Sequence, residues 1–183
     1  MAADRKRTLQ DHKRIRKTLL AIADINEMTS EEFIDVFGNV VEQSSFFAAA
    51  VWHHRPFQDV HHIHQVVCEF LTNLPCHGKQ GLLRSFQDLS DSVGLSSESK
   101  GERRAAGIDS LSHDETEKIQ ERNEMYRDKF NFPFVICARK NKKEAILEGL
   151  EIRLRNSFDE ELTNGVEEVK QIALFRLLDI VEN

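Results

Sequence analysis

The segment Lys129-Phe-Asn-Phe-Pro-Phe-Val-Ile-Cys-Ala-Arg139 is the most apolar run of this 183-residue chain. Pro133 lacks a backbone N–H and disfavours helical geometry in the residue before it, so no helix continues through the run. Helical patterns precede and follow it, so its buried N–H and C=O groups have no neighbouring strand as partner. The sequence predicts an all-α, single-domain helical bundle with one short extended segment near 132–138. That segment is either a buried crossover between helices or a backbone that binds a small molecule.

Signals for helix starts lie on both sides of this segment. Ser or Thr is followed three residues later by Glu, which is the capping-box pattern, at Thr29, Ser112 and Ser157. Apolar residues recur at helical spacing after each of these positions. The Ser-rich stretch 90–99 predicts a loop. We expect a short helix from Glu102 to Ile108 after it.

Charge is distributed unevenly along the chain. Its net charge is −6, whereas residues 1–20 alone carry +5 and the remainder −11. We therefore expect a basic N-terminal extension, 1–24, and a helical domain, 25–183. The extension could be a membrane-surface tail, an import presequence or a solvated arm, and the solvated arm is preferred. An acidic domain argues against nucleic-acid binding, and no apolar run is long enough to form a membrane span.

Cysteine and histidine usage gives little support for a metal centre. The three cysteines lack metal spacing and are odd in number, which favours a reducing compartment over a disulfide framework. Five of the eight histidines fall within residues 53–64, and His61 and His64 share one helix face. No carboxylate or cysteine stands at tight ligand spacing beside them. A surface run of neutral imidazoles is therefore the preferred interpretation, and no metal site is expected.

Two charged positions stand out against the apolar background. Arg176 has apolar neighbours one turn away on both sides, so its guanidinium must meet a carboxylate or a ligand. Asp179, three residues later, is the local candidate for an ion pair. Glu102 precedes two arginines and is expected to be a solvated helix cap unless it lies near Arg176 or the extended segment.

Several motifs occur together and in order along the chain. They are Phe37-Gly38-Asn39, Ala49-Ala50-Val51-Trp52, Arg55-Pro56-Phe57, Gly81-Leu82-Leu83-Arg84, Ala106-Gly107, the segment 129–139 and Arg153-Leu154-Arg155-Asn156. From about Asp24 to Val181 the chain thus resembles the 2-oxo-4-hydroxy-4-carboxy-5-ureidoimidazoline (OHCU) decarboxylase family. These carboxy-lyases form (S)-allantoin from a small-molecule intermediate of urate degradation.

The resemblance carries expectations for the site and for the assembly. It implies an all-α homodimer without cofactor or metal, in the peroxisome or the cytosol. The chain ends Val181-Glu182-Asn183 rather than in a Ser-Lys-Leu type address. Glu102 and Arg176 are the implied catalytic residues. The implied substrate-binding residues are Gln87, Ser99, Glu102, Arg103, Phe134, Val135, Ile136, Cys137, Ala138 and Arg176.

One departure from the family pattern concerns catalysis. Phe86 stands where the family has its catalytic histidine, Gln87 where it has a proline, and Arg103 where a glutamine is usual. His77, nine positions before Phe86, is a weak substitute because using it would require a rebuilt loop. Phenylalanine cannot transfer a proton. Two hypotheses follow: an OHCU decarboxylase with impaired turnover, or a catalytically inactive homologue that keeps the fold and the ligand pocket.

Overall fold

The structure is a computed structural model that describes residues 19–89 and 95–183. Within these residues the chain forms nine α-helices and two short 3-10 helices, with no β-strand, which confirms the all-α prediction. The elements are α2 (Ile22–Glu27), α3 (Ser30–Phe37), α4 (Ser45–Trp52), α5 (Val60–Asn73), α6 (Cys76–Arg84), α7 (Ser97–Ala106), η1 (Ile108–Ser110), α8 (His113–Phe130), η2 (Ala138–Lys140), α9 (Lys143–Arg153) and α10 (Phe158–Leu178).

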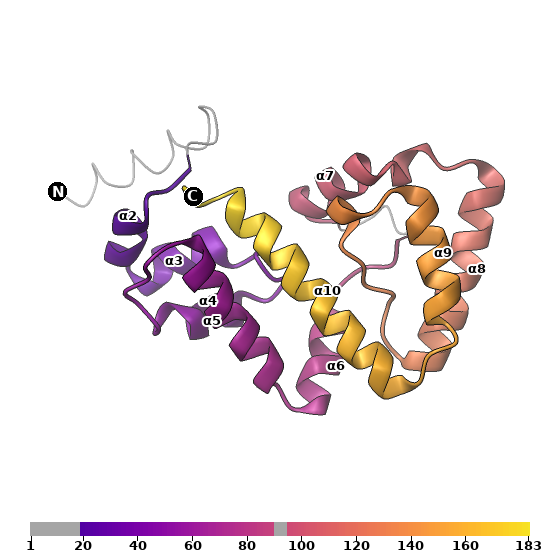
Figure 1. Ribbon diagram of the computed structural model, residues 1–183, viewed down its shortest axis with the longest axis horizontal. Coiled ribbons are helices and arrows are strands. Elements are labelled where there is room, and N and C mark those ends of the chain that lie inside the picture. The colour runs from indigo at the N-terminus through magenta and orange to yellow at the C-terminus, as the bar shows by residue number, and fades with distance from the viewer. Residues whose placement is uncertain (1–18, 90–94) are drawn as a thin grey trace.

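Helix α10 runs through the middle of the molecule (Figure 1). It packs against α5 and α6 on one side and against α8 and η2 on the other. The close approach to α6 requires the absence of a side chain at Gly165, because a Cβ there would lie 2.7 Å from Leu83 Cδ1. Nine of the 21 residues of α10 are buried, and a polar side chain among them needs a buried partner.

The predicted helix starts are confirmed by their capping geometry. At Thr29, Ser112 and Ser157 the side chain accepts from the backbone N–H three residues later, and the glutamate there returns a bond to the cap. Asp59 caps α5 in a simpler way, by accepting from the N–H of His62 at 2.7 Å. Local chemistry alone sets these helix starts, which is why the sequence could predict them.

The extended segment crosses from α8 to η2 through the core. Asn131 ends α8 in the left-handed conformation, with φ 60°. Phe132 and Phe134 are buried and pack around the ring of Tyr126, with the Phe134 and Tyr126 centroids 5.4 Å apart. The buried-crossover interpretation is thus confirmed, and the same backbone also lines a pocket, described below.

The helix expected over residues 102–108 begins earlier than predicted. Helix α7 starts at Ser97, because the Ser96 hydroxyl accepts from the N–H of Ser99 at 3.1 Å. It ends at Gly107, whose φ of 84° stops the helix. Glu102 therefore lies in the middle of the helix, and its expected role as a solvated cap is wrong.

The N-terminal end of the described chain contacts the C-terminal end. Leu20 N–H donates to Ile180 O at 2.7 Å, and Glu182 N–H donates to Leu20 O at 2.9 Å. These contacts lie inside the segment 1–24 that the sequence assigns to an extension, and residues 1–18 of that segment lie outside the described residues. No helix in the described part of the chain is long and apolar enough to cross a membrane.

Candidate active site

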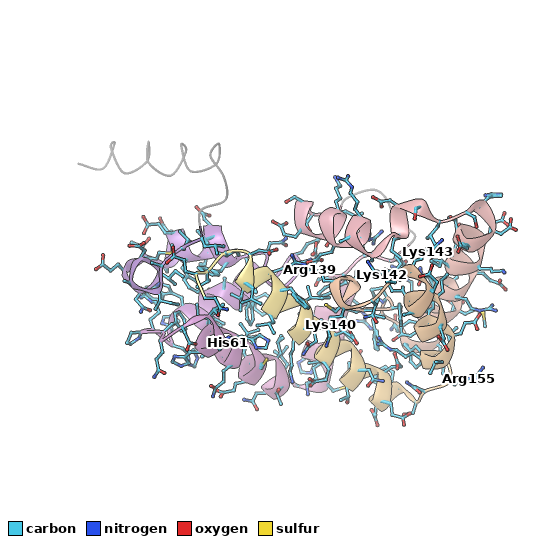
Figure 2. All side chains as sticks on the ribbon, turned by 45° about the horizontal axis from the view of Figure 1, so that its top comes forward. His61, Arg139, Lys140, Lys142, Lys143 and Arg155 are labelled. Carbon is cyan, nitrogen blue, oxygen red and sulfur yellow. The ribbon has the colours of Figure 1, made fainter. Side chains whose placement is uncertain are left out.

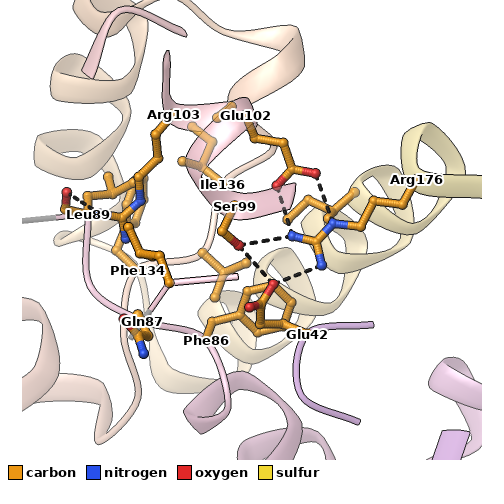
Figure 3. Close-up of a pocket in the computed structure, with 14 residues that line it drawn as sticks. Glu42, Phe86, Gln87, Leu89, Ser99, Glu102, Arg103, Phe134, Ile136 and Arg176 are labelled. Atoms are coloured by element: carbon orange, nitrogen blue, oxygen red, sulfur yellow. Dashed lines mark hydrogen bonds and ion pairs between the residues drawn. The ribbon is translucent and has the colours of Figure 1, made fainter. Parts of the chain in front are cut away.

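A pocket lies where α7, α10 and the extended segment meet the connections that follow α3 and α6 (Figure 3). Its empty volume is about 490 Å³, part of which is open to solvent. It is lined by Glu42, Phe86, Gln87, Leu89, Leu95, Ser99, Glu102, Arg103, Phe134, Val135, Ile136, Ala138, Ile172 and Arg176. Nine of the ten expected binding residues are therefore brought together in one place.

Arg176 is the centre of the polar side of this pocket. Its Nε donates to Glu102 Oε1 at 2.8 Å, and Nη2 donates to Glu102 Oε2 at 2.9 Å and to Ser99 Oγ at 3.1 Å. Its Nη1 donates to Asn39 O at 2.9 Å and lies 2.8 Å from Glu42 Oε2. Five contacts thus match the five N–H groups of the guanidinium.

Two carboxylates keep the Arg176 guanidinium charged. Burial by itself lowers its pKa, but the contacts with Glu102 and Glu42 raise the pKa overall. The side chain is only 3% exposed, so the charge is held largely out of water. A cation of this kind can stabilise negative charge that develops on a bound molecule.

Glu42 is a site residue that sequence reasoning missed. Its side chain is 3% exposed, and its Oε2 accepts from Ser99 Oγ at 2.8 Å and from Ser96 Oγ at 3.3 Å, beside Arg176. In the sequence it is a single carboxylate in a short connection between two helices. The one available signal in the sequence was its position directly after the apolar pair Val40-Val41.

Asp179 does not pair with Arg176, so the local ion pair that the sequence offered is wrong. Asp179 Oδ2 lies 2.9 Å from Nη1 of Arg139 instead. Arg139 belongs to a run of cationic side chains that continues through Lys142 and Lys143 into α9 (Figure 2). The side chain of Arg176 is buried, while Asp179 and Arg139 are partly exposed. Spacing along α10 thus did not identify the partner of Arg176.

The extended segment forms the opposite wall of the pocket. Val135 O accepts from Arg153 Nη1 at 2.8 Å. Within the described residues, no hydrogen bond uses the N–H of Val135 or of Ile136, and both residues line the pocket. Cys137 departs from expectation, since it is not among the lining residues and its N–H donates to Glu168 Oε2 at 2.7 Å.

A buried network holds this wall in place. Glu161 is fully buried and accepts from the Tyr126 hydroxyl, from Arg153 Nε at 2.9 Å and from Asn156 Nδ2 at 2.6 Å. Arg153 in turn binds the carbonyl of Val135. Side chains of α9 and α10 thereby supply backbone partners that a neighbouring strand would otherwise supply.

The connection after α6 carries the two positions at which the resemblance implies a departure from the family pattern. Phe86 and Gln87 both line the pocket. Oε1 of Gln87 is buried without a partner among the described residues, so it can accept from a ligand. Arg103 holds this connection by donating from Nη1 to Leu89 O at 2.9 Å and from Nη2 to Asp88 O.

His77 lies away from the pocket. It is exposed in the first turn of α6, whereas Phe86 follows the last turn of that helix. Among the described residues that line the pocket there is no histidine. In this structure His77 is therefore not placed to act on a molecule in the pocket.

The histidine-rich stretch forms no metal site in the described residues. No group of three or more His, Cys, Asp or Glu there is placed to hold a metal ion. His53, His54 and His61 are exposed, as expected for a surface run, and His61 lies on α5 in Figure 2. His64 is half-buried instead, because its Nε2 lies 2.9 Å from Lys170 O.

The fold and the pocket together define a class of protein. It is an all-helical protein with a small-molecule pocket, in which a buried arginine lies between two carboxylates and faces an extended backbone segment. The model of the OHCU decarboxylase family matches residues 26–178. The chain belongs to that family.

Relatives agree with this assignment, and solved structures share the fold. An OHCU decarboxylase from Amia calva is 41% identical over 162 residues, covering 86% of this chain and 93% of that protein. The corresponding enzyme from Xenopus laevis is 40% identical over 163 residues, covering 87% and 93%. An (S)-allantoin synthase structure matches with a TM-score of 0.71 at 23% identity over 88% of this chain and 54% of that one. An OHCU decarboxylase structure gives 0.64 at 19% identity over 82% and 96%, so the fold is shared.

Proposed function

We propose that this protein decarboxylates 2-oxo-4-hydroxy-4-carboxy-5-ureidoimidazoline to (S)-allantoin. The observation that carries the proposal is that Glu102 and Arg176 face the same pocket as the backbone of residues 134–136. These are the positions to which the family resemblance assigns catalysis and ligand binding. The names of the relatives from Amia calva and Xenopus laevis support the same reaction.

The chemistry of this reaction suits the pocket. Departure of CO₂ leaves an electron pair on the ring carbon, and that charge spreads toward neighbouring carbonyl and imine groups. The buried cation of Arg176 and the N–H groups of Val135 and Ile136 supply positive potential at fixed positions. Preorganised groups of this kind account for a large share of catalysis in many enzymes. Glu102 orients Arg176 through two hydrogen bonds.

Protonation of the ring carbon is the step for which this pocket is poorly equipped. Phe86 occupies the wall beside Glu42 (Figure 3) and cannot donate a proton. A positioned acid or base contributes on the order of 10²- to 10⁴-fold in rate. We therefore expect turnover slower by about that factor than in the same pocket with a histidine.

The same observation favours a second candidate function. With Phe86 in the pocket wall, the protein could be a catalytically inactive homologue that still binds the ligand. In both cases the family resemblance supports a homodimer that uses neither a metal nor an organic cofactor, in the peroxisome or the cytosol.

Circular dichroism on freshly generated substrate separates the two functions. If the protein is an enzyme, the signal of (S)-allantoin appears faster than in buffer, where unaided decarboxylation continues. Glu102→Gln should abolish the acceleration, whereas Glu124→Gln, at an exposed position on α8, should preserve it. A signal no faster than in buffer rejects the decarboxylase and leaves the inactive homologue.

A further inference from the structure

Glu42 has one carboxylate oxygen that the surrounding protein does not use. Its Oε2 lies 2.8 Å from both Ser99 Oγ and Arg176 Nη1 (Figure 3), and 3.3 Å from Ser96 Oγ. Within residues 19–89 and 95–183, no hydrogen bond uses its Oε1. Both oxygens of Glu102, by contrast, accept from Arg176. Of the two carboxylates in the described lining, Glu42 is therefore the one with an oxygen left for a bound molecule.

The backbone also fixes the position of Glu42. Its carbonyl oxygen accepts from Ser85 Oγ at 3.0 Å and from Ser44 Oγ at 2.9 Å. The next residue, Gln43, has a φ of 49°, a left-handed conformation that residues other than glycine rarely adopt. Such conformations cluster at functional sites, where the surrounding contacts hold them. The bond from Ser85 places Glu42 next to the connection that carries Phe86.

Few other side chains in the described pocket lining can move a proton. No histidine, cysteine or tyrosine is among these residues, and the guanidinium groups of Arg103 and Arg176 do not give up a proton in proteins. The hydroxyl of Ser99 already donates to Glu42 and accepts from Arg176. Resting on the proposed function, we propose that Glu42 is the catalytic proton carrier of this pocket and acts through Oε1.

The proposed reaction requires a proton to move between two atoms of the substrate. One ring carbon carries the hydroxyl and the carboxylate, and its neighbour carries the ureido group and forms the ring C=N bond. When CO₂ leaves, its bonding electron pair forms a C=C bond between these carbons. The C=N electron pair moves to the nitrogen, which takes a proton from water, and an enol results. The carboxylate of Glu42 then takes the hydroxyl proton as the carbonyl of allantoin forms, and returns it to the ureido carbon.

An ionised carboxylate suffices for this role, so the ion pair with Arg176 does not prevent it. A carboxylate is ordinarily a weaker base than an imidazole. Glu42 therefore replaces only in part the histidine that the family resemblance implies, in agreement with the slow turnover proposed above. Because Glu42 is fixed in one wall of the pocket, it delivers the proton to one face of the ureido carbon. Delivery to one face yields a single enantiomer of allantoin.

Glu42→Gln tests the assignment, because it removes the base and keeps an oxygen that can accept from Ser99. Release of CO₂ should remain faster than in buffer. Formation of (S)-allantoin should fall on the order of 10²-fold, and the product should become nearly racemic as water protonates the enol. The circular dichroism amplitude per mole of allantoin measures this loss. Glu98→Gln, at an exposed residue that contacts Asn39 outside the pocket, is the matched control and should behave as wild type.

Other outcomes overturn the assignment. If Glu42→Gln forms (S)-allantoin as fast as the wild type, Glu42 carries no proton. If CO₂ release falls in step with (S)-allantoin formation, Glu42 only holds Arg176 in place. Should Glu42→Gln fail to fold, Glu42→Asp keeps the charge beside Arg176 and withdraws the carboxylate by one methylene. A displacement of about 1 Å can cost on the order of 10²-fold in rate, so unchanged (S)-allantoin formation by Glu42→Asp rejects the assignment.

Hydrogen exchange on the unaltered protein tests the proton transfer independently of CO₂ release. The same transfer in reverse removes the C–H proton of the ureido carbon in (S)-allantoin. In D₂O the wild type should therefore speed the loss of that proton's NMR signal, and Glu42→Gln should not. Exchange no faster than in buffer, or equally fast in the variant, rejects the assignment. Exchange by the wild type without faster CO₂ release rejects the proposed decarboxylase and retains Glu42 as a proton carrier.

Discussion

Replacing Arg176 with Met removes the cation and leaves Glu42 and Glu102 as two carboxylates at one buried site. Their side chains are 3% and 14% exposed, so water can screen neither of them well. Removing one partner of a buried ion pair typically costs about 3–5 kcal/mol. We expect the free energy of unfolding at about pH 7 to fall by that amount, a large part of the stability of an ordinary domain.

The loss should depend on pH in a direction that the charges dictate. Without the guanidinium, the two like charges repel each other at a site that water screens poorly. This repulsion penalises the folded state at neutral pH, and binding of a proton by one carboxylate relieves it. Arg176→Met should therefore regain part of the lost stability on going from about pH 7 to about pH 5, whereas the wild type should not.

Urea unfolding followed by far-UV circular dichroism at the two pH values measures both effects. The matched control is Arg176→Met combined with Glu42→Gln, which removes the repulsion and should show no recovery at low pH. A loss below about 1 kcal/mol, or a pH response equal to that of the wild type, would refute the description of this site as a buried, mutually dependent set of charges.

Three further predictions concern the loop, the packing and the caps. Phe86→His with Gln87→Pro should raise kcat on the order of 10²- to 10⁴-fold in the circular dichroism assay, and an unchanged kcat would reject our account of the slow step. In thermal unfolding, Gly165→Ala should destabilise by about 1 kcal/mol through overpacking, while Gly101→Ala, in open space on α7, should stabilise by about 0.5–1 kcal/mol. Hydrogen bonds from Ser157, the N-cap of α10, lower the pKa of the Glu160 carboxyl from its ordinary value. The Glu160 carboxylate therefore stabilises the fold at pH values above its unfolded-state pKa. The stability difference between wild type and Glu160→Gln should vanish as the pH falls through the folded pKa, and its persistence there would contradict the role of that carboxylate.

Features fixed by neighbouring residues could be predicted from the sequence. The capping boxes at Thr29, Ser112 and Ser157 depend on contacts over three residues, and all three are present. Pro133 excluded a helix from the extended segment for an equally local reason. The start of α7 was missed because Ser96 lies in a serine-rich stretch in which several residues could serve as the cap.

The partners in the site could not be predicted, because they are distant in the sequence. Arg176 meets Glu102 across 74 residues and the carbonyl of Asn39 across 137. Helical spacing identified Arg176 as a buried cation but offered only Asp179 as its partner. Glu42 has no distinguishing neighbours beyond two valines, and only the fold places it beside Ser99, 57 residues away. Tertiary packing, not periodicity, decides such pairs.

We propose that the extended segment and the Glu102–Arg176 pair form one ligand site. An NMR titration of backbone amides with (S)-allantoin tests it most directly. We predict the largest shifts at Val135, Ile136 and Ala138, together with Glu102 on α7. Shifts concentrated away from this pocket, for example along α5, or no shifts at all, would contradict it.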